Sequence, residues 1–195
     1  VMVDGSRLPL PENIAATSAV AKLAKIYAVP VEAELGAVLG HEAGPLPPYE
    51  ELFASKKGFT DPMEAKRFAL ESGTDWLSVA IGNIHGAISD AGKQKEKPRA
   101  RIDLDHLSGL REACGIPLVL HGGTGISPEH VRAGIKLGIA KVNIATAIRQ
   151  PYERALAKGV TAAQEAVYQA MLGVLRDELQ LTGSASLLLE KSAER

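Results

Sequence analysis

Short apolar runs alternate with helix-like segments along this chain, and that alternation restricts the possible folds more than any other feature. Five runs have the length and composition of β-strands: 1–3, 31–35, 77–81, 117–120 and 141–145. Segments with helical spacing separate or follow them: 11–27, 60–72, 103–114, 128–137, 147–158 and 161–181. Repeated strand–helix units of this kind predict an α/β fold with a parallel sheet that is covered on both faces.

Two architectures fit five such units. They form either an open α/β sheet or the last five units of a closed TIM (β/α)8 barrel, which needs eight units and typically about 250 residues. The spacing alone leaves both open. No linker or repeat divides the chain, so we expect a single domain over residues 1–195. The segment 36–58 is rich in glycine and proline and is expected to be a long loop.

The charge balance and the cysteine content exclude several classes of protein. The chain has 22 basic and 23 acidic side chains and a net charge of −1, so we expect neither a nucleic-acid nor a membrane partner. The single cysteine, Cys114, excludes an internal disulfide framework and a cysteine-rich zinc site. No segment approaches the roughly 20 apolar residues that a membrane helix needs. We therefore expect a cytoplasmic protein.

Two histidines follow apolar runs directly, and each precedes a glycine. They are His85, after the run that begins at Trp76, and His121, after the run that begins at Pro117. A polar side chain where a buried strand leaves the core is costly unless it has a partner. In an α/β barrel that position faces the active site, and imidazole is a metal ligand. Two histidines do not complete a catalytic zinc site, so two hydrogen-bonded histidines at a sheet edge remain the alternative.

A glycine-rich turn and a polar segment predict a phosphate site. The turn is Gly122-Gly123-Thr124-Gly125, and Asn143-Ile144-Ala145-Thr146 follows it after the next strand begins. In barrels the loops after neighbouring late strands cradle phosphate, because backbone N–H groups and hydroxyls converge there. A glycine-rich turn alone also fits an ordinary loop.

Three acidic residues are candidates for chemistry near the strand ends. Glu34 lies in the strand 31–35, and Glu42 lies in the glycine-rich segment beyond it. A carboxylate on a loop that closes over substrate can act as a base, although Glu42 also fits a solvated loop charge. Asp4 follows the first strand and either caps the next helix or reaches a metal.

Taken together and in order, seven segments resemble the class II, metal-dependent ketose-bisphosphate aldolases. Seven ordered matches are far more specific than any single one. The segments are 1–6, 31–36, 40–44, 59–62, 80–86, 120–125 and 141–146.

The resemblance implies a TIM barrel and a zinc ion held by three histidines. Two of the three match His85 and His121. The family carries the third in a Leu-Asp-His motif on an earlier strand, and this sequence contains no such motif. The resemblance therefore implies that about the first three strands of the barrel lie outside this chain, which would be the C-terminal portion of the domain.

The resemblance also implies roles for individual residues. Glu42 matches the loop glutamate that moves the proton at the reacting carbon, and Asp4 and Glu34 match carboxylates that bind a secondary cation or help position the metal. The family's backbone near Gly86 also holds a monovalent cation. A further set matches the segments that hold dihydroxyacetone phosphate: Gly86, Gly122, Gly123, Thr124, Asn143, Ile144, Ala145 and Thr146.

The implied reaction is the reversible aldol cleavage of a ketose 1,6-bisphosphate, a step of glycolysis. Fructose and tagatose bisphosphate both remain open, although Ser89 and Ala145 look more like the tagatose branch. Two alternatives are a related lyase on another phosphoketose and a catalytically inactive remnant that only binds sugar phosphate. By analogy with the family, we expect a homo-oligomer, either a dimer or a tetramer.

Overall fold

The computed structural model describes residues 1–40, 47–85 and 99–186. The chain separates into two compact units, Val1–Ile144 and Ala145–Arg195, and each is described by itself. The expectation of a single domain stays a prediction. No helix in the described ranges has the length and apolar character needed to cross a membrane.

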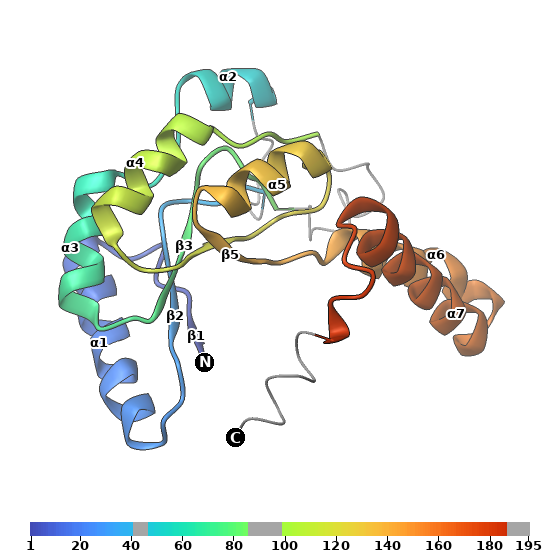
Figure 1. Ribbon diagram of the computed structural model, residues 1–195, viewed down its shortest axis with the longest axis horizontal. Coiled ribbons are helices and arrows are strands. Elements are labelled where there is room, and N and C mark those ends of the chain that lie inside the picture. The colour runs from blue at the N-terminus through green and yellow to red at the C-terminus, as the bar shows by residue number, and fades with distance from the viewer. Residues whose placement is uncertain (41–46, 86–98, 187–195) are drawn as a thin grey trace. The chain divides into compact units, whose positions relative to one another are not determined.

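The first unit is an α/β structure built on one parallel sheet. Five strands lie in the order β1-β2-β3-β4-β5, and every neighbouring pair is parallel. Helices α1, α3 and α4 lie together along one side of the sheet (Figure 1). The elements, in chain order, are β1 Met2–Val3, α1 Leu10–Ile26, β2 Glu32–Leu35, α2 Tyr49–Ala54, α3 Pro62–Ser72, β3 Trp76–Val79, α4 Leu104–Cys114, β4 Leu118–Leu120, α5 Pro128–Lys136 and β5 Ile139–Val142. The predicted α/β class and parallel sheet are confirmed.

The helices of this unit begin and end where local chemistry favours it. The Asp61 carboxylate accepts the N–H groups of Met63 and Glu64 at the start of α3, which also has proline in its first turn. The Asp103 carboxylate caps α4 by accepting the His106 N–H. Glycines in the left-handed conformation end both helices, and this returns the chain to the sheet. The core between the helices and the sheet contains fully buried side chains, including Phe68, Leu77, Leu107, Leu110 and Leu118.

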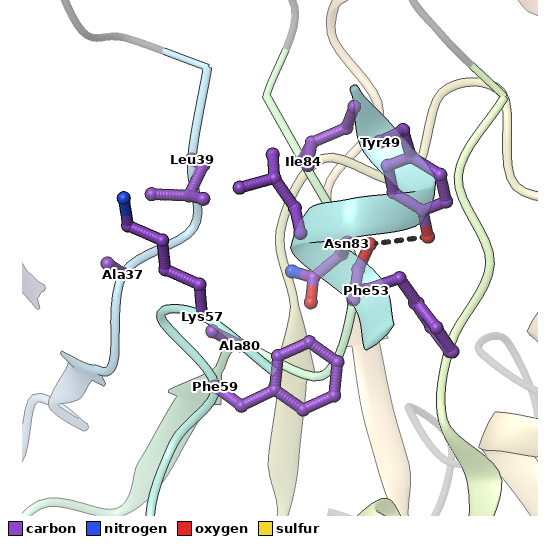
Figure 2. Close-up of a pocket in the computed structure, with 11 residues that line it drawn as sticks. Ala37, Leu39, Tyr49, Phe53, Lys57, Phe59, Ala80, Asn83 and Ile84 are labelled. Atoms are coloured by element: carbon purple, nitrogen blue, oxygen red, sulfur yellow. Dashed lines mark hydrogen bonds between the residues drawn. The ribbon is translucent and has the colours of Figure 1, made fainter. Parts of the chain in front are cut away.

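Two sequence-based expectations need correction. The segment 36–58 is not all loop, because residues 49–54 form α2. This short helix buries Leu52, and the Tyr49 hydroxyl accepts the Arg101 N–H at 2.7 Å and lies 2.9 Å from the Gly82 carbonyl oxygen. Figure 2 shows Tyr49 and Phe53 of α2 beside the small pocket that they line.

The last strand of the unit is also earlier than expected. The sequence predicts 141–145, whereas β5 spans Ile139–Val142. Gly138 has φ +111°, and its carbonyl oxygen accepts the Leu118 N–H. The chain can therefore enter the sheet directly after α5, and it leaves the sheet before Asn143.

The second unit is helical. Its elements are α6 Thr146–Ala155, the 3-10 turn η1 Leu156–Lys158, α7 Val160–Leu172 and the π-helical η2 Gly173–Glu178. Helices α6 and α7 pack against each other. The two helices expected over 147–158 and 161–181 are confirmed in outline, with Gly159 at φ +106° in the turn between them.

Candidate metal centre

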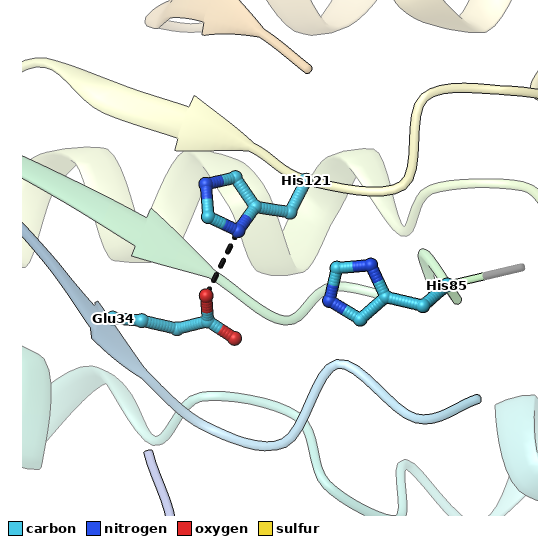
Figure 3. Close-up of side chains that lie close together, drawn as sticks. All are labelled: Glu34, His85 and His121. Carbon is cyan, nitrogen blue, oxygen red and sulfur yellow. Dashed lines mark ion pairs between the residues drawn. The ribbon is translucent and has the colours of Figure 1, made fainter. Parts of the chain in front are cut away.

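Three of the predicted ligands come together at one end of the parallel sheet. Glu34 lies on β2, His85 follows β3, and His121 follows β4 directly. One potential ligand atom from each of these residues lies within 4.8 Å of the other two. Figure 3 shows the Glu34 carboxylate directed at a ring nitrogen of His121, with His85 beside them. Carboxyl ends of parallel strands meet at one edge of a sheet, so segments that are distant in sequence converge there.

Asn83 attaches the segment that carries His85 to the end of β4. Its amide nitrogen donates to the carbonyl oxygen of His121 at 2.9 Å, and its side-chain oxygen accepts the Ile81 N–H at 2.8 Å. The N–H of His85 donates to the Leu39 carbonyl oxygen at 2.7 Å. The buried Asn83 side chain thus sets the relative position of the two histidine-bearing segments.

The glycine that follows His121 is required by close backbone packing. Gly122 has φ +66°, and a Cβ atom there would lie 2.3 Å from the Ile84 carbonyl oxygen. Gly40 has φ +125°, and its Cβ would lie 2.4 Å from the His85 carbonyl oxygen. Both glycines therefore let neighbouring loops approach more closely than a side chain would permit.

Buried charges surround the imidazole of His121. Its Nδ1 lies 2.8 Å from Glu34 Oε2, and its Nε2 lies 2.9 Å from Glu32 Oε1. Burial lowers the pKa of His121, but the hydrogen bonds with Glu34 and Glu32 outweigh it and raise that pKa above 6.5. Burial likewise raises the pKa of Glu32, but hydrogen bonds from Lys141 and His121 bring it below its usual value.

The donor set of Glu34, His85 and His121 fits a zinc ion. Zinc binds imidazole nitrogen and carboxylate oxygen, and a catalytic zinc site uses three such protein ligands with one position left open. Glu34 and His121 are buried, and His85 is partly buried, so a bound cation would be shielded from water on one side. Calcium and magnesium prefer oxygen ligands alone, and two imidazoles disfavour them.

The other predicted site residues have different positions. Asp4 is not a member of the donor cluster. Its Oδ1 accepts from the Ser6 hydroxyl at 2.6 Å and from the Ser6 N–H at 3.1 Å. Burial raises the pKa of Asp4, yet the hydrogen bonds from Ser6 hold it below its usual value. Glu42 and Gly86 lie outside the described residues.

The first predicted phosphate segment meets the beginning of the second within the first unit. Gly123 donates its N–H to the Asn143 carbonyl oxygen at 2.9 Å, and Asn143 donates to the Leu120 carbonyl oxygen at 2.9 Å. The Gly122–Thr124 turn therefore lies beside Asn143 and Ile144. Ala145 and Thr146 belong to the second unit, where Thr146 begins α6.

Two residues beside the donor cluster were not among the site residues predicted from the sequence. They are Glu32, which bonds His121, and Lys141, whose Nζ lies 2.6 Å from Glu32 Oε2. One signal was available for Glu32: residues two apart on a strand share a face, so Glu32 and Glu34 face the same way. No comparable signal identifies Lys141.

The parallel sheet and the cluster of two histidines and a carboxylate together define the class: an α/β protein with a candidate metal centre at the carboxyl ends of its strands. The family model for class-II fructose-bisphosphate aldolase matches residues 1–187. The chain belongs to that family, which confirms the resemblance inferred from the seven segments.

Curated relatives agree with the family assignment. The fructose-bisphosphate aldolase of Streptococcus pneumoniae (strain TIGR4) is 39% identical over 159 residues, which cover 81% of this chain and 49% of that protein. The fructose-bisphosphate aldolase of Streptococcus pyogenes serotype M3 is 40% identical over 147 residues, which cover 75% of this chain and 45% of that protein. The chain thus spans about half the length of the curated relatives it matches.

Solved structures support the same conclusion. The YdjI aldolase of Escherichia coli K12 has a TM-score of 0.67 and 30% identity, with 89% of this chain and 58% of that chain covered. A structure from Coccidioides immitis has a TM-score of 0.72 and 28% identity, with 95% of this chain and 64% of that chain covered.

Proposed function

We propose that the protein containing this chain catalyses the reversible, zinc-dependent aldol cleavage of a ketose 1,6-bisphosphate. The products are dihydroxyacetone phosphate and glyceraldehyde 3-phosphate, and the reaction is a step of glycolysis. The single observation that carries the proposal is the convergence of Glu34, His85 and His121 in a member of the class-II aldolase family. Because the chain spans about half of its curated relatives, the activity belongs to the whole protein.

The sheet is proposed to be the last five βα units of a TIM barrel. Support comes from the five parallel strands in sequential order and from the aldolase structures, of which this chain covers 58% and 64%. The remaining strands would supply the third histidine and the aspartate that the family carries in its Leu-Asp-His motif.

His85 and His121 would hold the zinc ion, with Glu34 as a neighbouring or alternating ligand. When bound, zinc supplies a Lewis acid that stabilises negative charge on the substrate's carbonyl oxygen. Asp4 is proposed to help position the metal or a secondary cation, and the backbone near Gly86 is proposed to bind a monovalent cation. Glu42 is proposed to move the proton at the reacting carbon.

The substrate phosphate is proposed to bind between the loops that follow β4 and β5. Gly122, Gly123 and Thr124 come from one loop, and the segment from Asn143 through Ile144 and Ala145 to Thr146 comes from the other. Backbone N–H groups in a glycine-rich turn bind anions well, and Thr hydroxyls add donors. The contact between Gly123 and Asn143 supports this pairing of loops.

Zinc content and cleavage, measured on the same samples, test the proposal. His85→Ala and His121→Ala should each abolish bound zinc and cleavage together. Glu42→Ala should retain zinc and slow proton exchange on dihydroxyacetone phosphate. Cleavage of fructose against tagatose 1,6-bisphosphate assigns the substrate. Phosphate binding without cleavage by the unaltered protein would support the inactive remnant, and full zinc occupancy in both histidine variants would overturn the metal assignment.

Two further properties complete the proposal. We propose a cytoplasmic protein, which accords with the aldolase relatives and the sugar-phosphate substrate class. We also propose a homo-oligomer, a dimer or a tetramer, by analogy with the family. Sedimentation of the purified protein measures the oligomeric state directly.

A further inference from the structure

A buried carboxylate connects His121 to a lysine on the last strand. One oxygen of Glu32 lies 2.9 Å from His121 Nε2, and the other lies 2.6 Å from Lys141 Nζ. The Glu32 side chain is only 3% exposed. A buried carboxylate is costly unless it is paired and hydrogen-bonded, and both oxygens of Glu32 meet that condition. The three residues come from β2, the end of β4 and β5, so the sheet itself holds them together.

The two carboxylates of β2 occupy opposite sides of one imidazole. Glu34 contacts Nδ1, and Glu32 contacts Nε2. Figure 3 shows His85 on the side of the His121 ring that faces Glu34. A histidine that binds a metal through one nitrogen donates its other ring N–H to a carboxylate or carbonyl, and this contact sets the tautomer and the ring orientation. Glu32 has the position of such a partner.

We propose that Glu32 and Lys141 are positioning residues for the metal centre. Glu32 accepts the Nε2–H of His121 and so directs Nδ1 toward the metal, while Lys141 holds Glu32 in place. The inference rests on the proposed function, because it assumes that His121 is a metal ligand. Neither residue contacts the Nδ1 side of the ring, so both act through His121.

The strand register supplies an independent observation for Lys141. The pairing of β4 with β5 shifts between Leu118 and Val119: Leu118 is level with Ile139, but Val119 is level with Lys141. One additional residue, Ala140, therefore lies in β5. Because side chains alternate between faces, such a bulge changes the face on which the next side chain lies. Lys141 consequently shares a face with Val119 and with His121, which lies two residues after Val119 and directly follows β4.

Four variants of the purified full-length protein test the proposal by zinc affinity, measured through competition with a chromogenic chelator. Glu32→Gln should weaken zinc binding about 10- to 100-fold, the range found for partners of metal-bound histidines. Lys141→Met should weaken it less. The Glu32→Gln/Lys141→Met double variant should bind zinc as Glu32→Gln does, because Lys141 acts only through Glu32. Lys141→Arg should restore affinity close to that of the unaltered protein.

The matched control is Glu71→Gln, the same chemical change in an exposed pair with Arg67. It should leave zinc affinity unchanged. A second readout is the ¹⁵N NMR spectrum of the zinc-loaded protein with labelled histidine. The unaltered protein should show a ligand histidine that keeps its Nε2 proton, and that signal should shift or broaden in Glu32→Gln. If Glu32→Gln does not fold, the Lys141→Met and Lys141→Arg pair carries the test, because the Lys141 side chain is 44% exposed.

The outcomes separate this inference from the proposed function. Unaltered zinc affinity and an unaltered histidine signal in Glu32→Gln, or in both Lys141 variants, would overturn the positioning role and leave the aldolase proposal intact. Failure of the unaltered protein to bind zinc would overturn the proposed function, and the positioning role with it.

Discussion

Two parts of the sheet use polar side chains for different purposes. In the turn before β3, Asp75 accepts the Val31 N–H at 2.7 Å, and the Thr74 hydroxyl lies 3.0 Å from the Val31 carbonyl oxygen. These side chains bond to the backbone. Around His121 the polar side chains bond to one another, with Glu32 and Glu34 on its two ring nitrogens. The first arrangement satisfies backbone groups, whereas the second concentrates charge.

The difference indicates which of the two arrangements stabilises the fold. A side chain that pairs with a buried backbone group removes a cost that folding would otherwise carry. A buried ion pair usually contributes little net stability, because desolvation offsets the attraction, yet removal of one partner is strongly destabilising. The cluster around His121 therefore adds a vulnerability to the fold, and the proposed metal site would account for it.

The largest expected effect follows from removal of the ring at the centre of the cluster. His121→Ala leaves the buried Glu34 carboxylate without its 2.8 Å ion pair, so we expect a loss of about 3–5 kcal/mol in the free energy of unfolding. Urea denaturation at pH 7 in the presence of a chelator measures this loss without a metal contribution. His130→Ala is the control, since the His130 ring in α5 bonds the hydroxyl of Ser127, the N-cap residue of that helix. A loss below about 1 kcal/mol for His121→Ala would show that the cluster is not an energetic unit.

A pair of glycines compares the packing at the two ends of β4. Gly115, before the strand, and Gly122, after it, both have φ +66°. A Cβ at Gly115 meets nothing within 4 Å, whereas one at Gly122 would lie 2.3 Å from the Ile84 carbonyl oxygen. Gly115→Ala should cost about 1 kcal/mol for the left-handed conformation alone. Gly122→Ala should cost about 1–3 kcal/mol more, because the clash is with backbone. Thermal denaturation of both variants measures the difference, and equal losses would contradict the close packing.

Much of this sheet could be predicted because the relevant signals are local. Asp61 and Asp103 cap helices that the sequence places correctly, since a cap and its helix are adjacent in the chain. The convergence of Glu34, His85 and His121 was also predictable, because the carboxyl ends of parallel strands share one edge whatever the details of packing.

The remaining features depend on contacts between distant residues. Lys141 reaches Glu32 across 109 residues, through a register shift that no local pattern reveals. The start of β5 at Ile139 and the helix at 49–54 also depend on tertiary contacts, the latter on the bonds of Tyr49 to Gly82 and Arg101. A bond between two side chains that are distant in the chain, such as Lys141 with Glu32, is thus harder to predict from sequence than a helix cap, in which a side chain bonds the backbone a few residues away.

A smaller effect is expected in the turn before β3. Asp75→Ala removes the acceptor of the Val31 N–H, which lies in a buried segment, and should cost about 1–2 kcal/mol in the free energy of unfolding. Asp75→Asn keeps an acceptor oxygen and should recover most of that loss. Zinc affinity should not change in either variant, because the turn lies at the opposite end of β3 from His85. A change in zinc affinity together with stability would remove the distinction between the two arrangements.

The smallest expected effect concerns Cys114, which ends α4 close to the amino end of β4. Burial raises the pKa of its thiol from 9.0 to about 11. A folded-state pKa above the unfolded value gives a contribution to stability that is fully present below pH 9 and is lost as the pH rises through 11. At pH 10 the loss should stay below about 1 kcal/mol, because water still reaches part of the side chain. Urea denaturation of the unaltered protein and Cys114→Ala at pH 7 and pH 10 isolates the thiol: the variant should lose less stability between the two pH values. An equal loss in both proteins would mean that the thiol does not contribute, and that the alkaline sensitivity belongs to other groups.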